Sequence, residues 1–207
     1  MSQRHDRYAA LLALTAALLL QGCVALIGAG GVAAYSSLED RRTTGTQIDD
    51  EGIEVRAANR INERFRDRAH VNVIAYSRAV LITGEAVDEA TRAEIEQIVL
   101  AVPNVRAVTN EVQLAGLSSV GSRANDSSLT LKVRSRFLNA KGFSPVHVKV
   151  VTEAGVVYLM GIVTVKEADA AVEIARTTGG VRKVVKVFEY CKSTDEPCRP
   201  AKPKPAA

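Results

Sequence analysis

Aromatic side chains are scarce in this chain of 207 residues, which contains no tryptophan and has 4% aromatic residues in all. Flat rings on which nucleobases or sugars could stack are therefore few. The formal net charge is only +4 at pH 7, with an isoelectric point near 9.0. This small excess is compatible with an anionic partner but does not require nucleic acid, so we expect no nucleic-acid binding.

The N-terminus has the pattern of an exported and lipidated protein. A basic start precedes an apolar run over residues 11–20, which is too short for a permanent membrane span. The sequence Leu-Gln-Gly-Cys then ends at Cys23 and resembles a bacterial lipobox, in which a peptidase cleaves before an acylated cysteine. We therefore predict a signal peptide over residues 1–22 and acylation of Cys23, with palmitate as a typical chain. Several acyl chains together give lasting anchoring.

The residue after this cysteine indicates which membrane holds the protein. Val24 stands where an Asp would be the usual inner-membrane retention signal in enteric-type bacteria. We therefore predict a lipid-anchored protein on the periplasmic face of the outer membrane. The alternatives are an ordinary signal peptide and a short membrane anchor with an incidental cysteine.

Cysteine and histidine are too few to indicate a metal site. Cys191 and Cys198 are separated by six residues, which in an oxidising periplasm favours a small disulfide loop. Two free thiols remain an alternative, as does metal binding, although no histidine lies near and two thiolates are half a zinc site. We expect no metal and no cofactor.

The same scarcity argues against an enzyme. His70 and His147 stand at equivalent places at the start of predicted strands. No Ser, Cys or carboxylate set is repeated beside them, so we interpret both as strand-edge side chains with no catalytic role.

The chain between its two ends contains a duplication at an offset of 76 or 77 residues. The matching segments are Ile53–Ile61 with Leu129–Phe137, Val80–Gly84 with Val157–Gly161, and Val105–Val108 with Val181–Val184. We predict a tether over 23–50, a first domain over 51–115, a Gly/Ser-rich linker over 116–126 and a second domain over 127–190. A cysteine loop and a disordered Pro/Lys tail follow over 191–207.

Hydrophobic periodicity predicts the same five elements, αββαβ, in each copy. In the first copy these are a short helix near 53–61, strands at Val71–Tyr76 and Ala79–Gly84, a helix over 88–102 and a strand at Val105–Leu114. In the second they are a helix over 129–139, strands at Val146–Thr152 and Val156–Gly161, a helix over 166–178 and a strand at Val181–Glu189. The fold class is α+β: two tandem domains, each a three-stranded mixed sheet packed on two helices. We expect the last strand to pair beside the first.

Several local signals accompany this pattern. Thr164 and Glu167 have the spacing of a capping box, and the acidic run 49–51 is expected to cap the first helix. Gly84 and Gly161 close the second strand of each copy, which indicates a positive φ or a close approach by a helix.

Three segments of the second copy carry a family resemblance. They are Leu-Thr-Leu-Lys-Val-Arg-Ser-Arg-Phe-Leu at 129–138, Val-Val-Tyr-Leu-Met-Gly-Ile-Val-Thr at 156–164 and Gly-Gly-Val-Arg-Lys-Val at 179–184. They resemble the BON domain, and two copies behind a lipobox resemble the dual BON-domain outer-membrane lipoproteins of the DolP/YraP type. The resemblance implies a non-enzymatic periplasmic protein that binds anionic phospholipid, largely through its second BON domain, and supports outer-membrane integrity.

Lipid binding needs cations at the level of the headgroups, beside apolar groups that can enter below them. The helix over 129–139 combines both kinds of side chain on the face opposite its predicted core residues. The candidate lipid-binding residues are Ser128, Leu131, Lys132, Arg134, Ser135, Arg136 and Leu138. The expected partner is a membrane containing phosphatidylglycerol or cardiolipin. A solvated helix flank is the simpler alternative, and an adaptor that docks outer-membrane assembly proteins is the rival function.

Overall fold

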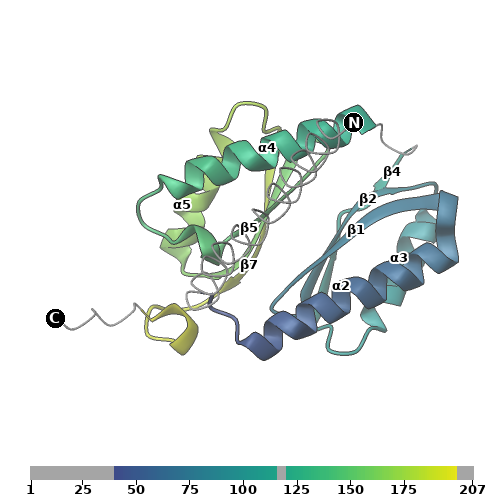
Figure 1. The fold of residues 1–207 in the computed structure, drawn as a ribbon, viewed down its shortest axis with the longest axis horizontal. Helices are drawn as coiled ribbons and strands as arrows, with labels where there is room; N and C mark the ends of the chain where they lie inside the picture. The colour runs from purple at the N-terminus through teal and green to yellow at the C-terminus, as the bar shows by residue number, and fades with distance from the viewer. Residues whose placement is uncertain (1–39, 116–119, 200–207) are drawn as a thin grey trace, which may run out of the picture. The chain divides into compact units, whose positions relative to one another are not determined.

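The computed structural model describes residues 40–115 and 120–199 (Figure 1). The predicted signal peptide and Cys23 lie outside these residues. Within the described ranges, no helix has both the length and the apolar character needed to cross a bilayer.

Two copies of the predicted αββαβ order are present. The first contains α2 (Thr44–Phe65), η1 (Arg66–Arg68), β1 (Ala69–Tyr76), β2 (Ala79–Ala86), α3 (Glu89–Leu100), β3 (Ala107–Asn110) and β4 (Gln113–Leu114). The second contains α4 (Val120–Leu138), η2 (Pro145–His147), β5 (Lys149–Glu153), β6 (Val156–Val163), α5 (Val165–Arg176), β7 (Lys183–Tyr190) and η3 (Glu196–Cys198). The α+β fold class is confirmed.

The strand order differs from the expected one. β2 pairs antiparallel with β1 and parallel with β3 and β4. Likewise, β6 pairs antiparallel with β5 and parallel with β7. The prediction that the last strand lies beside the first is therefore wrong, because the second strand occupies the centre of each sheet. Seven of the eight residues of β2, and of β6, are buried, and such a continuously buried strand suits a central position covered on both faces.

Both first helices begin earlier than predicted. Thr43 is the N-cap of α2, and its side chain accepts a hydrogen bond from the Thr46 amide. The acidic run 49–51 therefore lies inside the helix, and the prediction that it caps the helix is wrong. α4 starts at Val120, so the predicted linker over 116–126 is largely helical. In the helical part of this segment, Gly121 costs about 1 kcal/mol relative to alanine, and the helix forms in spite of this local preference.

Two smaller predictions are also corrected. Residues 146 and 147 were expected in a strand but belong to η2, because Pro145 at its first turn cannot donate to a sheet and favours a helical start. The predicted strand 105–114 is divided into β3 and β4. The capping box of Thr164 and Glu167 at the start of α5 is confirmed.

A buried aspartate joins each first helix to the following hairpin. The Asp50 carboxylate accepts hydrogen bonds of 2.8 and 2.7 Å from the amides of the turn 77–78. Asp126 accepts bonds of 2.9 and 2.8 Å from the amides of the turn 154–155. All four turn residues have positive φ, the backbone that tight two-residue hairpins require. This interaction, rather than helix capping, explains the acidic residue near the start of each copy.

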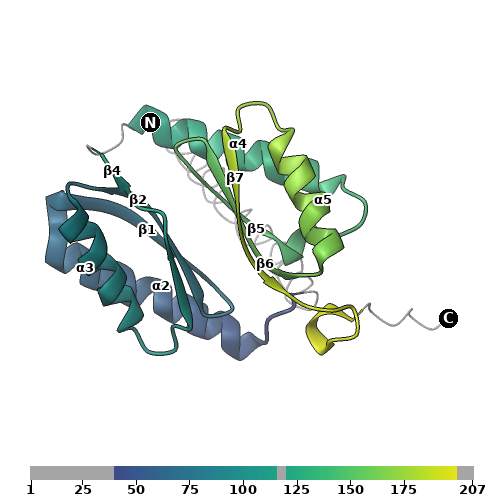
Figure 2. The ribbon, with the colours of Figure 1, turned by 180° about the vertical axis from the view of Figure 1, so that it is seen from behind.

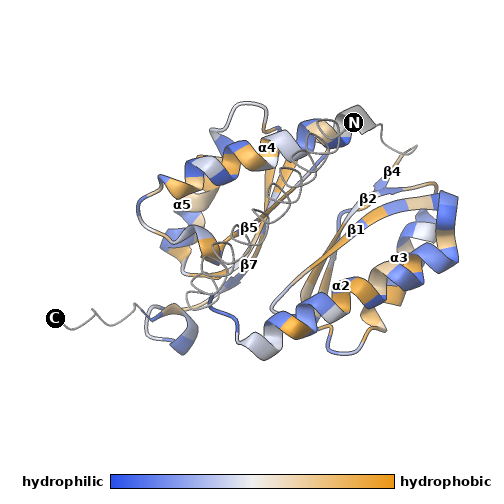
Figure 3. Ribbon diagram, viewed as in Figure 1, coloured by the Kyte–Doolittle hydropathy of each residue, from blue (hydrophilic) through white to orange (hydrophobic). Residues whose placement is uncertain are grey.

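The helices of each copy cover one face of its sheet (Figures 1 and 2). In Figure 3 the strands are mostly orange, whereas the helices alternate between orange and blue. One core cluster fills the helix side of each sheet. A third cluster draws on the opposite faces of both sheets, and its buried members are Tyr76, Leu81, Tyr158, Met160, Ile162 and Cys198.

The two C-terminal cysteines are joined in the structure. Cys191 and Cys198 form a disulfide with a Cα–Cα distance of 6.2 Å. Cys198 is buried in the third cluster, so the bridge fastens the segment after β7 against the sheets.

Close backbone contact explains the glycines that the sequence analysis singled out. A Cβ atom at Gly161 would lie 2.2 Å from the His147 carbonyl oxygen, and one at Gly84 would lie 2.1 Å from that of His70. Gly84 also has a φ of +111°. The predicted positive φ is therefore confirmed at Gly84. The predicted approach of a helix is wrong, because the approaching group at both glycines is a backbone carbonyl, and both strands continue for two residues beyond the glycine.

We predict that Gly161→Ala lowers the free energy of unfolding by at least about 2 kcal/mol, because the new methyl group overlaps the His147 carbonyl. Denaturant unfolding measures the loss. Gly179→Ala is the matched control, since a Cβ there meets nothing within 4 Å. Equal stability of the two variants would contradict the close-contact explanation.

Candidate functional site

Five of the predicted lipid-binding residues line one open groove of about 650 Å³ on the second domain. They are Ser128, Leu131, Lys132, Ser135 and Arg136, and the groove is completed by Thr178 and Gly179 from the end of α5. Arg134 and Leu138 lie outside the groove, exposed on the same helix. Thr178 and Gly179 were missed because the pairing of α4 with the end of α5 has no local signal in the sequence.

The periodicity of α4 fixes which side chains face outward. Leu129, Val133 and Phe137 are buried at 3%, 0% and 1% exposure. The opposite face leaves Leu131 and Leu138 at 66% and 75% exposure. Two leucines in water beside basic residues are an amphipathic pattern that suits a membrane surface.

One cation of this face is bonded within the fold, and two others are exposed. Arg136 donates hydrogen bonds of 2.7 Å to the Ile174 carbonyl and to Thr178 Oγ1, so its guanidinium satisfies groups at the end of α5. Lys132 and Arg134 are exposed and, within the described part of the chain, form no hydrogen bond or ion pair. These two side chains are therefore the cations available to a ligand.

The other end of α5 is held by an ion pair. Arg41 donates two hydrogen bonds of 2.8 Å to the Glu167 carboxylate and a third, also 2.8 Å, to the Ile162 carbonyl. Burial alone would raise the pKa of Glu167, but the hydrogen bonds from Arg41 and Thr164 outweigh it and lower that pKa to about 2. α5 is thus fixed at both ends, which positions its C-terminal end as a wall of the groove.

The first domain has a corresponding groove with different charges. It measures about 490 Å³ and is lined by Arg60, Glu63, Arg64, Glu94, Ile98 and Ala101. Arg60 donates to the Ala101 carbonyl at 3.2 Å, much as Arg136 does to that of Ile174. Arg64 is paired with Glu94 at 2.7 Å. The two carboxylates make this groove a poorer site for an anion than the second one.

We predict that Arg136→Ala lowers the free energy of unfolding by about 1 kcal/mol, because Thr178 Oγ1 loses its donor and the Ile174 carbonyl loses one of its three donors. Lys132→Ala should change it by less than about 0.5 kcal/mol, as expected for an exposed residue without a partner. Chemical denaturation of both variants tests whether Arg136 stabilises the fold and Lys132 does not. If Lys132→Ala lowers the free energy of unfolding as much as Arg136→Ala does, the assignment of a structural role to Arg136 alone is wrong.

The chain belongs to the BON-domain family: the BON domain matches residues 49–116 and 125–192. With two such domains, it is a dual BON-domain outer-membrane lipoprotein of the DolP/YraP type. It is 36% identical over 179 residues to the outer membrane lipoprotein DolP of Haemophilus influenzae, covering 86% of this chain and 93% of that protein. It is 35% identical over 153 residues to the 21 kDa hemolysin of Actinobacillus pleuropneumoniae, covering 73% and 79%. The predicted family and outer-membrane location are confirmed.

Proposed function

We propose that this lipoprotein is not an enzyme, and that it binds anionic phospholipid through the α4 face of its second BON domain and so supports outer-membrane integrity. One observation carries the proposal: the unpaired cations Lys132 and Arg134 lie on the same exposed helix as the exposed Leu131 and Leu138. Phosphatidylglycerol and cardiolipin supply the matching charge. In the proposal, acylated Cys23 provides the anchor.

The physical chemistry of the face fits a weak and reversible contact. Each Lys or Arg near an anionic surface contributes about 1 kcal/mol, and two leucines add a small apolar contribution on entering the acyl boundary. Such a contact is sufficient for a tethered protein, because a tether raises the effective concentration of the domain at the membrane without any new interaction.

A protein–protein adaptor for an envelope assembly machine is the second candidate, and one feature of the first domain favours it. An open groove of about 490 Å³ runs beside β1. Val55, Val71 and Val73 are among its lining residues, and Val151 of the second domain also lines it. β1 is an edge strand, since it pairs only with β2 in its sheet. Edge strands can accept an extended segment of a partner protein.

We predict that the chain from Val24 onward floats with vesicles containing phosphatidylglycerol or cardiolipin, and does not float with phosphatidylcholine vesicles. Lys132→Glu with Arg134→Glu should weaken binding about tenfold or more, because two attractive charges become repulsive. Arg134 is chosen over Arg136 because Arg136 is bonded to α5.

The matched control is Arg56→Glu, which reverses the charge at the position of the first domain that aligns with Lys132. It should bind vesicles as the unchanged protein does. Vesicle binding that survives Lys132→Glu with Arg134→Glu would refute the proposed face. Absence of binding by the unchanged chain would favour the adaptor.

A further inference from the structure

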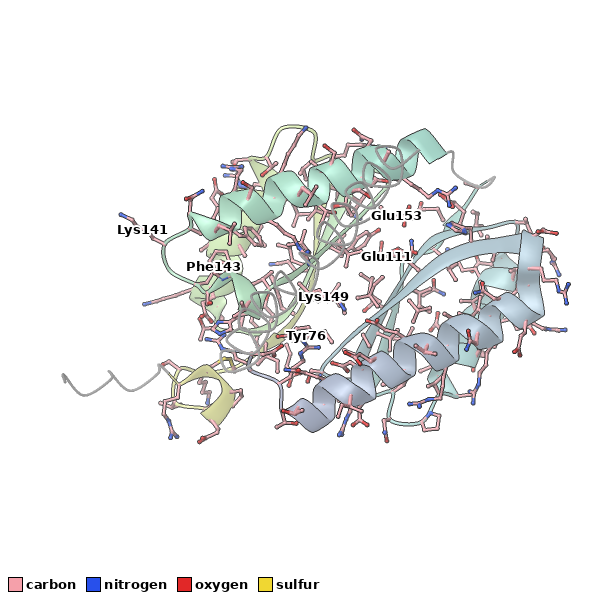
Figure 4. The ribbon with its side chains drawn as sticks, viewed as in Figure 1. Tyr76, Glu111, Lys141, Phe143, Lys149 and Glu153 are labelled. Carbon is pink, nitrogen blue, oxygen red and sulfur yellow. A yellow bond between two sulfur atoms is a disulfide. The ribbon has the colours of Figure 1, made fainter. Side chains whose placement is uncertain are left out.

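Glu153 is a buried acidic residue in the contact between the two BON domains. It ends β5 and is 9% exposed; Figure 4 labels it. Its Oε2 accepts a hydrogen bond of 3.0 Å from Asn72 Nδ2 and one of 3.3 Å from Thr83 Oγ1. Both donors belong to the first domain, so this carboxylate is a polar link between the domains.

Glu85 is a second buried acid on the same side of the first sheet. It lies two residues after Thr83 on β2 and is 6% exposed. Among the described residues, its Oε2 atom has no hydrogen-bond partner. A buried carboxylate oxygen without a donor is costly, and a second negative charge near it adds to that cost.

The surroundings of Glu153 are predominantly acidic. Burial raises the pKa of Glu153, and the charges of Glu85 and Asp126 raise it further, against the hydrogen bonds from Asn72 and Thr83, which lower it. The charged and titratable groups near Glu153 on the packed elements are His70, Glu85, Glu111, Arg123, Asp126, Lys149, Tyr158 and Lys183. Lys183 lies on β7, in register with Val156, the strand partner of Glu153.

Two of these cations contact residues other than Glu153 and Glu85. Lys149 Nζ lies 3.0 Å from the Glu54 carboxylate, and Arg123 lies 2.9 Å from His70 Nε2. The Tyr158 hydroxyl is 3.5 Å from Glu111, and burial raises the pKa of its phenol. Among the described residues, neither Glu85 nor Glu153 forms an ion pair.

We propose that Glu153 holds a proton in the contact between the two BON domains, and that loss of this proton loosens the contact. The proton is taken up from solvent, and protonated Glu153 keeps an acceptor oxygen for Asn72 and Thr83. Without it, two buried carboxylates repel each other. The device makes the domain contact sensitive to pH.

The sign of the dependence follows from proton binding. The folded protein holds the Glu153 proton to a higher pH than the unfolded chain does, so it binds more protons in that window. Stability therefore falls as pH rises from the ordinary glutamate pKa to the raised one, and this contribution then stays constant. Acidification through the same window tightens the contact.

Glu153→Gln tests the proposal in the chain from Val24 onward, which contains every residue of the three core clusters. The amide keeps an acceptor for Asn72 and Thr83, supplies an N–H donor and carries no charge. We expect the variant to melt about 2–4 °C above the unchanged protein at pH 8, with a smaller difference at pH 5. Glu63→Gln, on the exposed face of α2, is the control and should leave the pH dependence unchanged.

Hydrogen exchange gives a second measurement, at residues whose side chains lie in the domain contact. At pH 8, the amides of Leu81 and Met160, both in the third cluster, should exchange more slowly in Glu153→Gln than in the unchanged protein. A variant that melts at or below the unchanged protein at pH 8, or that exchanges faster at these amides, would overturn the proposal. Either result would mean that Glu153 stabilises the contact as a charged acceptor.

Discussion

Each sheet has one face covered by helices and a second, apolar face that must also be kept from water. The rest of the structure depends on how this second face is covered. Helices pack on one face only, and the central strands β2 and β6 also present apolar side chains on the other. Leu81, Tyr158 and Met160 meet there in one buried cluster. Because the sheets cover each other, the outer sides of the helices stay in water. Those helix surfaces are where the two open grooves between helices lie.

The sequence predicted what local patterns control and missed what depends on distant contacts. Periods of two and 3.6 residues correctly indicated the αββαβ order in both copies. Strand order was wrong because pairing joins segments far apart in the chain. The role of Asp50 was mistaken for helix capping, because an acid near a helix start has that meaning locally. Its recurrence as Asp126, at the repeat offset, was a usable signal.

The candidate site shows the same limit at the level of single side chains. The helical period alone placed Leu131, Lys132 and Ser135 on one outward face, and the structure brings them to one groove. It could not separate Arg136 from its neighbours, because the acceptors of that guanidinium lie on α5. A basic residue on an exposed helix is available to a ligand only if the fold has not already engaged it.

Because the chain contains two copies of the domain, residues that both copies share can be compared with residues that only the second copy has. Arg60 and Arg136 occupy equivalent positions, and each bonds a backbone carbonyl near the C-terminal end of the second helix of its domain, so packing explains a cation at this position in both copies. Lys132 is likewise matched by a cation in the first copy. Arg134 and Leu138, in contrast, stand where the first copy has Ala58 and Asn62. A property that only the second domain has must depend on such differences, and an added cation beside an added exposed leucine is the change that an anionic lipid surface would favour.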